Sequence, residues 1–147
     1  MALPEAEADG PGTDGDALVV AHLPAAPAFI RLARLLVSCF LETHLRVGEI
    51  RDHGIRLAVT EVFTAAVEAH GRAAVDAPLV LRLALHDGNA CISLQDAAPH
   101  GNGGRPEVAD PRVHGGLVLA RALVDDAWVE PTPDGQVVHL LVHGAGR

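Results

Sequence analysis

Histidine is the residue type in this sequence with the widest chemistry, since its ring binds metal ions and exchanges protons near neutral pH. Nine histidines occur in the 147 residues. His139 and His143 are four residues apart, but in a strand this spacing separates them by about 13 Å, too far to share one tetrahedral metal ion. His100 and His114 lie in or beside an irregular segment and could meet only through its loop geometry. We therefore predict scattered surface histidines and no metal site.

Three other places in the sequence carry residues with binding or catalytic chemistry. Glu61 lies within an apolar helical pattern, Asp96 directly follows an apolar strand pattern, and the pair Gly115-Gly116 precedes a further helical pattern. Taken alone, they favour ordinary roles as a solvated helix residue, a turn residue and a flexible loop end. The sequence contains no Ser-His-Asp nucleophile elbow, no phosphate-binding P-loop and no dinucleotide-binding fingerprint.

Composition narrows the classes of partner and compartment. The net charge is −8 and lysine is absent, so the arginines form no basic stripe and we expect no direct nucleic-acid partner. No apolar run approaches the roughly 18 residues of a membrane span, and residues 1–16 are acidic where a secretory signal would be basic and then apolar. We expect a cytoplasmic protein without a membrane partner. Cys39 and Cys91 lie in apolar periodic segments and are predicted to be buried free thiols.

The chemistry-bearing residues must be positioned by one folded domain, because the length and the 49 % apolar content fit a single core. Residues 1–16 are predicted to be a disordered acidic leader, and residues 17–147 to form the domain. A strand is predicted at residues 17–23.

Two helices should follow this strand. One starts near Pro27, and the next starts near residues 47–51 and runs to about Gly71, with Gly54 as a place for an interruption. Both carry apolar residues at helical spacing, which predicts a core-facing side. These residues are Ile30, Ala33, Val37, Phe40 and Leu41 in the first helix, and Val59, Val62, Phe63 and Ala66 in the second.

Strands and a long loop occupy the centre of the sequence. Residues 79–86 alternate leucine with other residues, which predicts a strand with one apolar face. Asp87-Gly88-Asn89 is typical of a hairpin turn, and residues 90–95 form the returning strand. Residues 97–114 contain prolines and glycines without periodicity, and we predict a mobile lid there.

The last third should contain a helix and a hairpin. The helix is predicted to open at Gly115-Gly116 with Leu119, Ala122 and Leu123 on its core side, followed by strands at residues 127–130 and 136–142. This order of elements predicts an α+β two-layer sandwich, in which a mixed, mostly antiparallel sheet is covered on one face by three helices.

Four segments within residues 17–143 carry a resemblance to a known family. They are LPAAPAFIRLARLLVSCFLETHL, LAVTEVFTAAVEAHG, ISLQDAAP and GGLVLARALVDDAWVEPTPDGQVVHLLV. In order and spacing they resemble the histidine-kinase-like ATPase (GHKL) superfamily, in particular the anti-sigma factor serine/threonine kinases. The resemblance implies the two-layer fold predicted above and binding of ATP with Mg²⁺.

The resemblance also implies roles for individual residues. Glu61 matches the helix glutamate that orients or deprotonates the attacking hydroxyl. Ala65 stands where the family has a Mg²⁺-binding asparagine, one helical turn later, and an alanine methyl cannot bind the metal.

Base and phosphate contacts are implied further along the chain. Asp96 matches the aspartate that accepts a hydrogen bond from the adenine amine, and Ala98 stands where the family has a glycine beside the base. His114 replaces the first glycine of the family's phosphate-binding glycine box, and Gly116 matches the second. With Gly115 and Leu117, these residues are predicted to present backbone N–H groups to the phosphates at a helix N-terminus.

The function implied by the resemblance is transfer of the γ-phosphate of ATP to a serine of an antagonist protein in a bacterial transcription-regulating pathway. A sigma factor, an anti-anti-sigma protein, or both would be partners, and the family suggests a homodimer. Ala65 and His114 favour an alternative, in which the chain is a non-catalytic partner-binding module with a degenerate nucleotide site. A weaker alternative is a free-standing fragment of a two-component histidine kinase.

Overall fold

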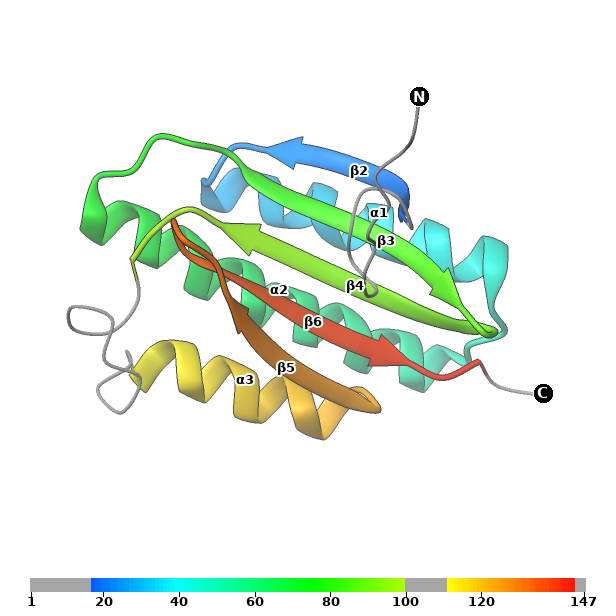
Figure 1. The fold of residues 1–147 in the computed structure, drawn as a ribbon. Helices are drawn as coiled ribbons and strands as arrows, with labels where there is room; N and C mark the ends of the chain where they lie inside the picture. Colours follow the sequence, from blue (N-terminus) through cyan, green and yellow to red (C-terminus); the bar gives the residue numbers. More distant parts are fainter. Residues whose placement is uncertain (1–16, 100–110, 145–147) are drawn as a thin grey trace, which may run out of the picture.

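In the computed structural model, the described residues form a five-stranded sheet as one layer, and three helices cover one of its faces (Figure 1). The structure describes residues 17–99 and 111–144. The predicted leader at residues 1–16, and residues 100–110 of the predicted lid with His100, lie outside the described residues.

The sheet has the strand order β2-β3-β4-β6-β5. All four pairings are antiparallel, so the parallel pairs that a mixed sheet allows do not occur among the described strands. The strands are β2 (Ala17–Leu23), β3 (Leu79–His86), β4 (Asn89–Asp96), β5 (Asp126–Pro131) and β6 (Gln136–Val142).

A two-residue turn joins β3 to β4. Asp87 has φ 54° and Gly88 has φ 82°. Two left-handed residues in succession are typical of a type I′ turn, whose twist matches that of the flanking strands. This turn sets the register in which Leu83 pairs with Ile92, and both side chains are buried.

The helices are α1 (Ile30–His44), which follows a short 3-10 turn at Pro27–Phe29, α2 (Glu49–Ala73) and α3 (Pro111–Leu123). α2 is continuous through Gly54, so the predicted interruption there is absent. It also continues two residues beyond Gly71, and the left-handed position that ends it is taken by Ala74, with φ 56°. None of the described helices is long and apolar enough to cross a bilayer.

The core lies between the helices and the sheet. The predicted stripes of α1 and α2 are buried except for Ile30, which is half-buried. The predicted face of α3 is wrong in part: Leu119 and Ala122 are exposed, while Ala120 is buried, as is Val124 directly after the helix. The face shifts because α3 packs beside α2 as well as on the sheet, so the side turned toward α2 is covered too.

The free thiols differ in exposure. Both cysteines are unpaired, but Cys39 on α1 is exposed, so the prediction of burial is wrong for it. Cys39 lies two residues after buried Val37 and one before buried Phe40, at the edge of the apolar stripe. Cys91 is buried in β4, and burial raises the pKa of its thiol by more than the contact with Ser93 Oγ lowers it.

Candidate functional site

Asp96, the last residue of β4, is held in one orientation. It is 4 % exposed, and its Oδ1 accepts hydrogen bonds from the backbone N–H of Gln136 at 3.2 Å and of Ala98 at 3.3 Å. One donor belongs to the neighbouring strand β6 and the other to the segment that leaves β4. A carboxylate fixed in this way can accept a hydrogen bond from a ligand without losing side-chain entropy, because its orientation is already set before binding.

Gly135 makes this arrangement possible by close approach. A Cβ added at Gly135 would lie 2.5 Å from the carbonyl oxygen of Asp96 and 3.0 Å from the nitrogen of Ala98. In the sequence, Gly135 lies in the short Pro-Thr-Pro-Asp-Gly connection, residues 131–135, between the last two predicted strands. Its contact with Asp96, 39 residues earlier, depends on the antiparallel pairing of β4 with β6 and could not be read from turn chemistry.

His70 ties the same strand end to the helix layer. Its Nε2 accepts a hydrogen bond from the backbone N–H of Ala97 at 2.9 Å, and the side chain is 2 % exposed. The prediction that the histidines are scattered on the surface is therefore wrong for His70, and also for His139, which is 3 % exposed. Both occupy buried faces because each ring has a polar partner there.

Glu61 lies on α2, nine residues before His70 and therefore about 13 Å away along the helix axis. It follows Gly54 by seven residues, close to two helical turns, so the two residues share a face. That face points to α3, because a Cβ on Gly54 would contact Leu123 at 3.5 Å. Glu61 and Ala65 are both half-buried. The α3-facing side of α2 thus carries Glu61 and, one turn later, the alanine.

The glycine pair does not open α3. The helix begins at Pro111, four residues before Gly115, so His114, Gly115 and Gly116 lie inside it. In an α-helix that begins at Pro111, the N–H of Gly115 faces the carbonyl of Pro111 and the N–H of Gly116 faces the carbonyl of Arg112. The predicted start of α3 at Gly115 is therefore wrong, and the contacts of Gly115 and Gly116 with the phosphates stay a prediction.

Two further predicted contacts lie close to the core. Ala98 is fully buried, and it is not among the positive-φ residues, so the side chain in place of the family's glycine causes no backbone strain. Leu117 is half-buried and packs against the core.

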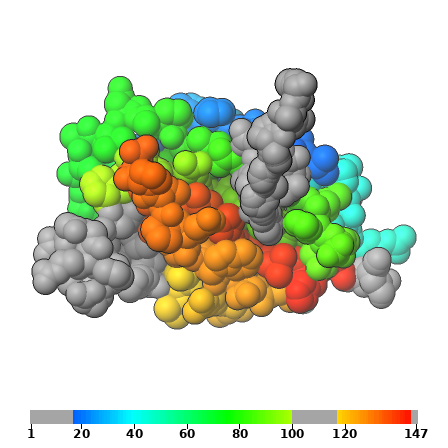
Figure 2. All heavy atoms as spheres, in the orientation of Figure 1, coloured from blue at the N-terminus to red at the C-terminus, as the bar shows by residue number. Residues whose placement is uncertain are grey.

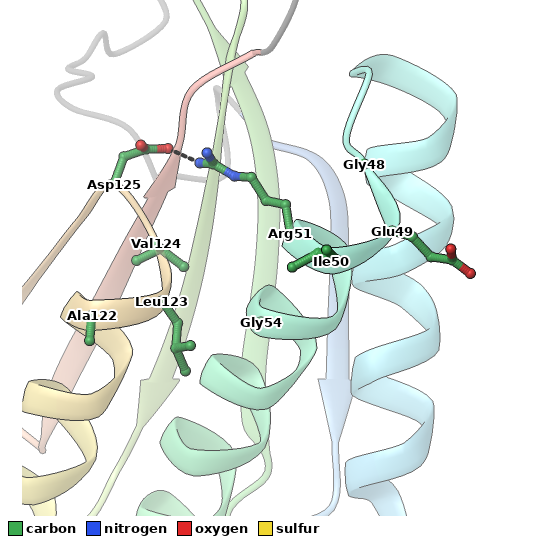
Figure 3. A pocket seen from close by; sticks show the side chains of 9 residues that line it. All are labelled: Gly48, Glu49, Ile50, Arg51, Gly54, Ala122, Leu123, Val124 and Asp125. Carbon is green, nitrogen blue, oxygen red and sulfur yellow. Dashed lines mark hydrogen bonds and ion pairs between the residues drawn. The ribbon is translucent and has the colours of Figure 1, made fainter.

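At the opposite end of α2 lies a cleft of about 760 Å³ (Figure 3). It is lined by residues 48–51 and 54, at the start of α2, and by residues 122–125, which are the last two residues of α3 and the two that follow. Arg51 and Asp125 form an ion pair across it, and Asp125 also accepts a hydrogen bond from the backbone N–H of His143. Burial raises the pKa of Asp125, but the His143 and Arg51 contacts outweigh it and hold this pKa below its ordinary value. The cleft contacts neither Glu61 nor Asp96.

Ser93, His139 and Glu130 form a hydrogen-bonded group on the sheet face opposite the helices, the face seen in Figure 2 with β5 and β6 in orange and red. Ser93 and His139 are buried, whereas the Glu130 side chain is 64 % exposed. Ser93 Oγ lies 2.8 Å from His139 Nδ1, and His139 Nε2 lies 2.8 Å from Glu130 Oε1. Trp128 stacks on the histidine ring at 5.1 Å. Serine, histidine and carboxylate are the groups of a nucleophilic triad, but Ser93 is fully buried, so a substrate has no access to its hydroxyl. The role of this group is structural: Ser93 and Glu130 provide hydrogen-bond partners for the buried His139 ring.

No group of three histidine, cysteine, aspartate or glutamate residues within residues 17–99 and 111–144 is arranged to hold a metal ion. His143 lies beside Asp125, with Nδ1 3.8 Å from Oδ1.

Comparisons with known proteins bear on the family and the fold. The family model "Histidine kinase-like ATPase domain" matches residues 23–142. Among solved structures, the chain is similar to the RsbU and RsbW domains of Rv1364c from Mycobacterium tuberculosis, with a TM-score of 0.65 and 24 % identity, over 86 % of this chain and 32 % of that one. The chain therefore spans about a third of that protein's length, and the likeness shows a shared fold. No curated protein matches the chain. The predicted family and fold are confirmed.

Proposed function

Because the chain belongs to the histidine kinase-like ATPase family, we propose that it binds ATP with Mg²⁺ and acts as a regulator of the anti-sigma factor serine/threonine kinase type. The observation that carries this proposal is the buried Asp96 carboxylate, held by two backbone N–H groups at the end of β4. Its acceptor oxygens suit the exocyclic amine of adenine and repel the carbonyl oxygen that guanine has in its place.

Glu61 is the residue proposed for proton transfer. Bound ATP would supply the γ-phosphoryl group, and Glu61 would accept the proton of the serine hydroxyl on the antagonist protein. Residues at the start of α3, including His114, Gly115 and Gly116, are proposed to lie near the phosphates after the helix start rearranges. Because Ala65 provides no ligand, Mg²⁺ would be held mainly by phosphate oxygens and water.

A non-catalytic partner-binding module is the second candidate, and Ala65 is the observation that favours it. In that case the protein would keep the fold and the adenine contact of Asp96 but would no longer transfer phosphate. In both cases the proposed partners are a sigma factor, an anti-anti-sigma protein, or both, in the bacterial cytoplasm, with residues 17–147 as the nucleotide-binding domain and a homodimer as the assembly. Pull-down from the source organism, followed by size-exclusion chromatography with light scattering, tests partner and assembly.

Calorimetric titration with Mg·ATP tests the proposal directly. Wild-type protein should bind ATP, and Asp96→Asn should abolish or strongly weaken binding, since an amide can present a donor to the adenine amine. Asp87→Asn is the matched control, because Asp87 is exposed in the turn at the opposite end of β4. Absence of heat with wild-type protein at millimolar nucleotide would remove the proposal.

Restoring the missing metal ligand separates the two candidates. If the protein transfers phosphate, Ala65→Asn should raise the transfer rate or lower the Mg²⁺ concentration required. Transfer of ³²P from γ-labelled ATP to an antagonist protein recovered by pull-down measures this. ATP binding without transfer in both the wild type and Ala65→Asn would favour the non-catalytic module.

A further inference from the structure

The hydrogen bond between His70 and Ala97 joins the C-terminal end of α2 to the residue that follows Asp96. We propose that His70 is a positioning residue for adenine recognition, which holds the Asp96 carboxylate in place relative to the helix that carries Glu61. This inference rests on the proposed ATP-binding function. His70 would not touch the nucleotide itself and would act on it only by holding the backbone next to Asp96.

The donor in this bond is a backbone N–H, so Nε2 must be the acceptor. The imidazole is therefore neutral, with its proton on Nδ1. Nδ1 is itself buried and has no hydrogen-bond partner among the described residues. A buried donor without a partner is unfavourable, and an apolar side chain would avoid it. The favourable polar interaction of this ring is the one that Nε2 makes with Ala97.

Asp96 is held on its other sides by the sheet. Gln136 N–H comes from β6, and Gly135 packs against the Asp96 carbonyl from the same segment. The sheet contacts fix Asp96 relative to β6, and the His70 contact fixes the adjoining peptide relative to α2. Besides the apolar packing of α2 on β4, the His70 contact and nine residues of continuous helix connect the adenine end to Glu61.

Loss of the His70 Nε2 acceptor should therefore affect base recognition more strongly than it affects the fold. Ala97 could move away from α2, and the Asp96 carboxylate would lose the sub-ångström placement that a specific contact requires. The affinity for adenine nucleotides would fall most, because adenine is the base that donates a hydrogen bond to this carboxylate. The affinity for guanine nucleotides would change little, since guanine makes no such contact.

Two substitutions test this proposal. His70→Gln keeps an acceptor near the position of Nε2, whereas His70→Asn is too short to reach Ala97. We expect His70→Asn to weaken Mg·ATP binding about tenfold, the effect of one hydrogen bond, and to reduce the ratio of ATP to GTP affinity. His70→Gln should keep most of both. Amide hydrogen exchange at Ala97 should accelerate in His70→Asn and stay slow in His70→Gln.

His139→Phe is the control for general loss of a buried histidine. It removes a ring that bonds Ser93 on the other face of the sheet and should lower the Tm without changing the ATP to GTP ratio. The inference is overturned if wild type binds ATP and His70→Asn binds it with unchanged affinity and ratio. It is also overturned if His139→Phe changes the ratio as much as His70→Asn. If the wild type binds neither nucleotide, the proposed function itself fails, and the role of His70 in base recognition with it.

Discussion

The two ends of α2 are attached to the sheet in different ways. At the C-terminal end the attachment is buried and neutral, through His70 and Ala97, beside Gly135, where an added Cβ would clash with the backbone of Asp96. At the N-terminal end it is a partly exposed ion pair between Arg51 and Asp125. A buried neutral contact positions atoms with little dependence on solvent, whereas an exposed ion pair responds to pH and salt. The end of α2 that carries the proposed adenine site is thus the more rigidly defined.

The largest effect is expected at the rigid end. Gly135→Ala would place a methyl 2.5 Å from the Asp96 carbonyl oxygen, and backbone must move to relieve the clash. We expect the free energy of unfolding to fall by about 1–3 kcal/mol, the usual cost of overpacking, and ATP binding to weaken. Urea unfolding and nucleotide titration measure these. Gly71→Ala is the control, because a Cβ there meets nothing within 4 Å.

A glycine-to-alanine substitution near the N-terminal end of α2 should raise the free energy of unfolding instead of lowering it. In Gly54→Ala the new methyl would make an ordinary contact with Leu123 at 3.5 Å. Replacing a glycine in a helix interior then raises the free energy of unfolding by about 0.5–1 kcal/mol. Thermal and urea unfolding test this. Destabilisation by Gly54→Ala would show that α2 and α3 approach more closely than this contact indicates.

The smallest effect concerns the ion pair and depends on pH. Asp125→Asn should lower the free energy of unfolding by about 0.5 kcal/mol at neutral pH, as expected for a partly exposed pair. The folded-state pKa of Asp125 lies below its unfolded value of about 3.9. The stabilisation is therefore fully present above the unfolded pKa and is lost as pH falls through the folded one.

Urea unfolding of both proteins between pH 7 and pH 2 measures this difference, with 1 M NaCl as a second condition that should reduce it. Asp76→Asn serves as the exposed reference. A difference between the wild type and Asp125→Asn that persists unchanged at pH 2 would contradict an electrostatic origin.

Local patterns predicted most of the fold. The strand at residues 17–23 and the last strand at residues 136–142 have the predicted bounds, and the order of elements is as expected. The errors lie at helix ends and faces. α3 begins at Pro111 because a proline fits the first helical turn, which outweighs the signal of the glycine pair. Cys39 is exposed because it lies at the edge of the buried stripe of α1.

The candidate site was predicted less completely. Glu61 and Asp96 were found through the resemblance of their segments, and their functional roles stay predictions. His70 was inside a quoted segment but carried no signal of its own, since its partner is a backbone N–H 27 residues away. Gly135 was not singled out, because the sequence does not show which strand end the connection between the last two strands will contact.

By itself, the sequence determined the type and order of the secondary structure elements and the apolar faces of α1 and α2, because these depend on the period of nearby residues. Tertiary structure alone decided that His70 would accept a hydrogen bond from Ala97 and that Gly135 would pack on Asp96. Both contacts join segments that meet only after β4 has paired with β6 and α2 has packed on the sheet. Such contacts follow from the packing of whole elements, which no local period encodes.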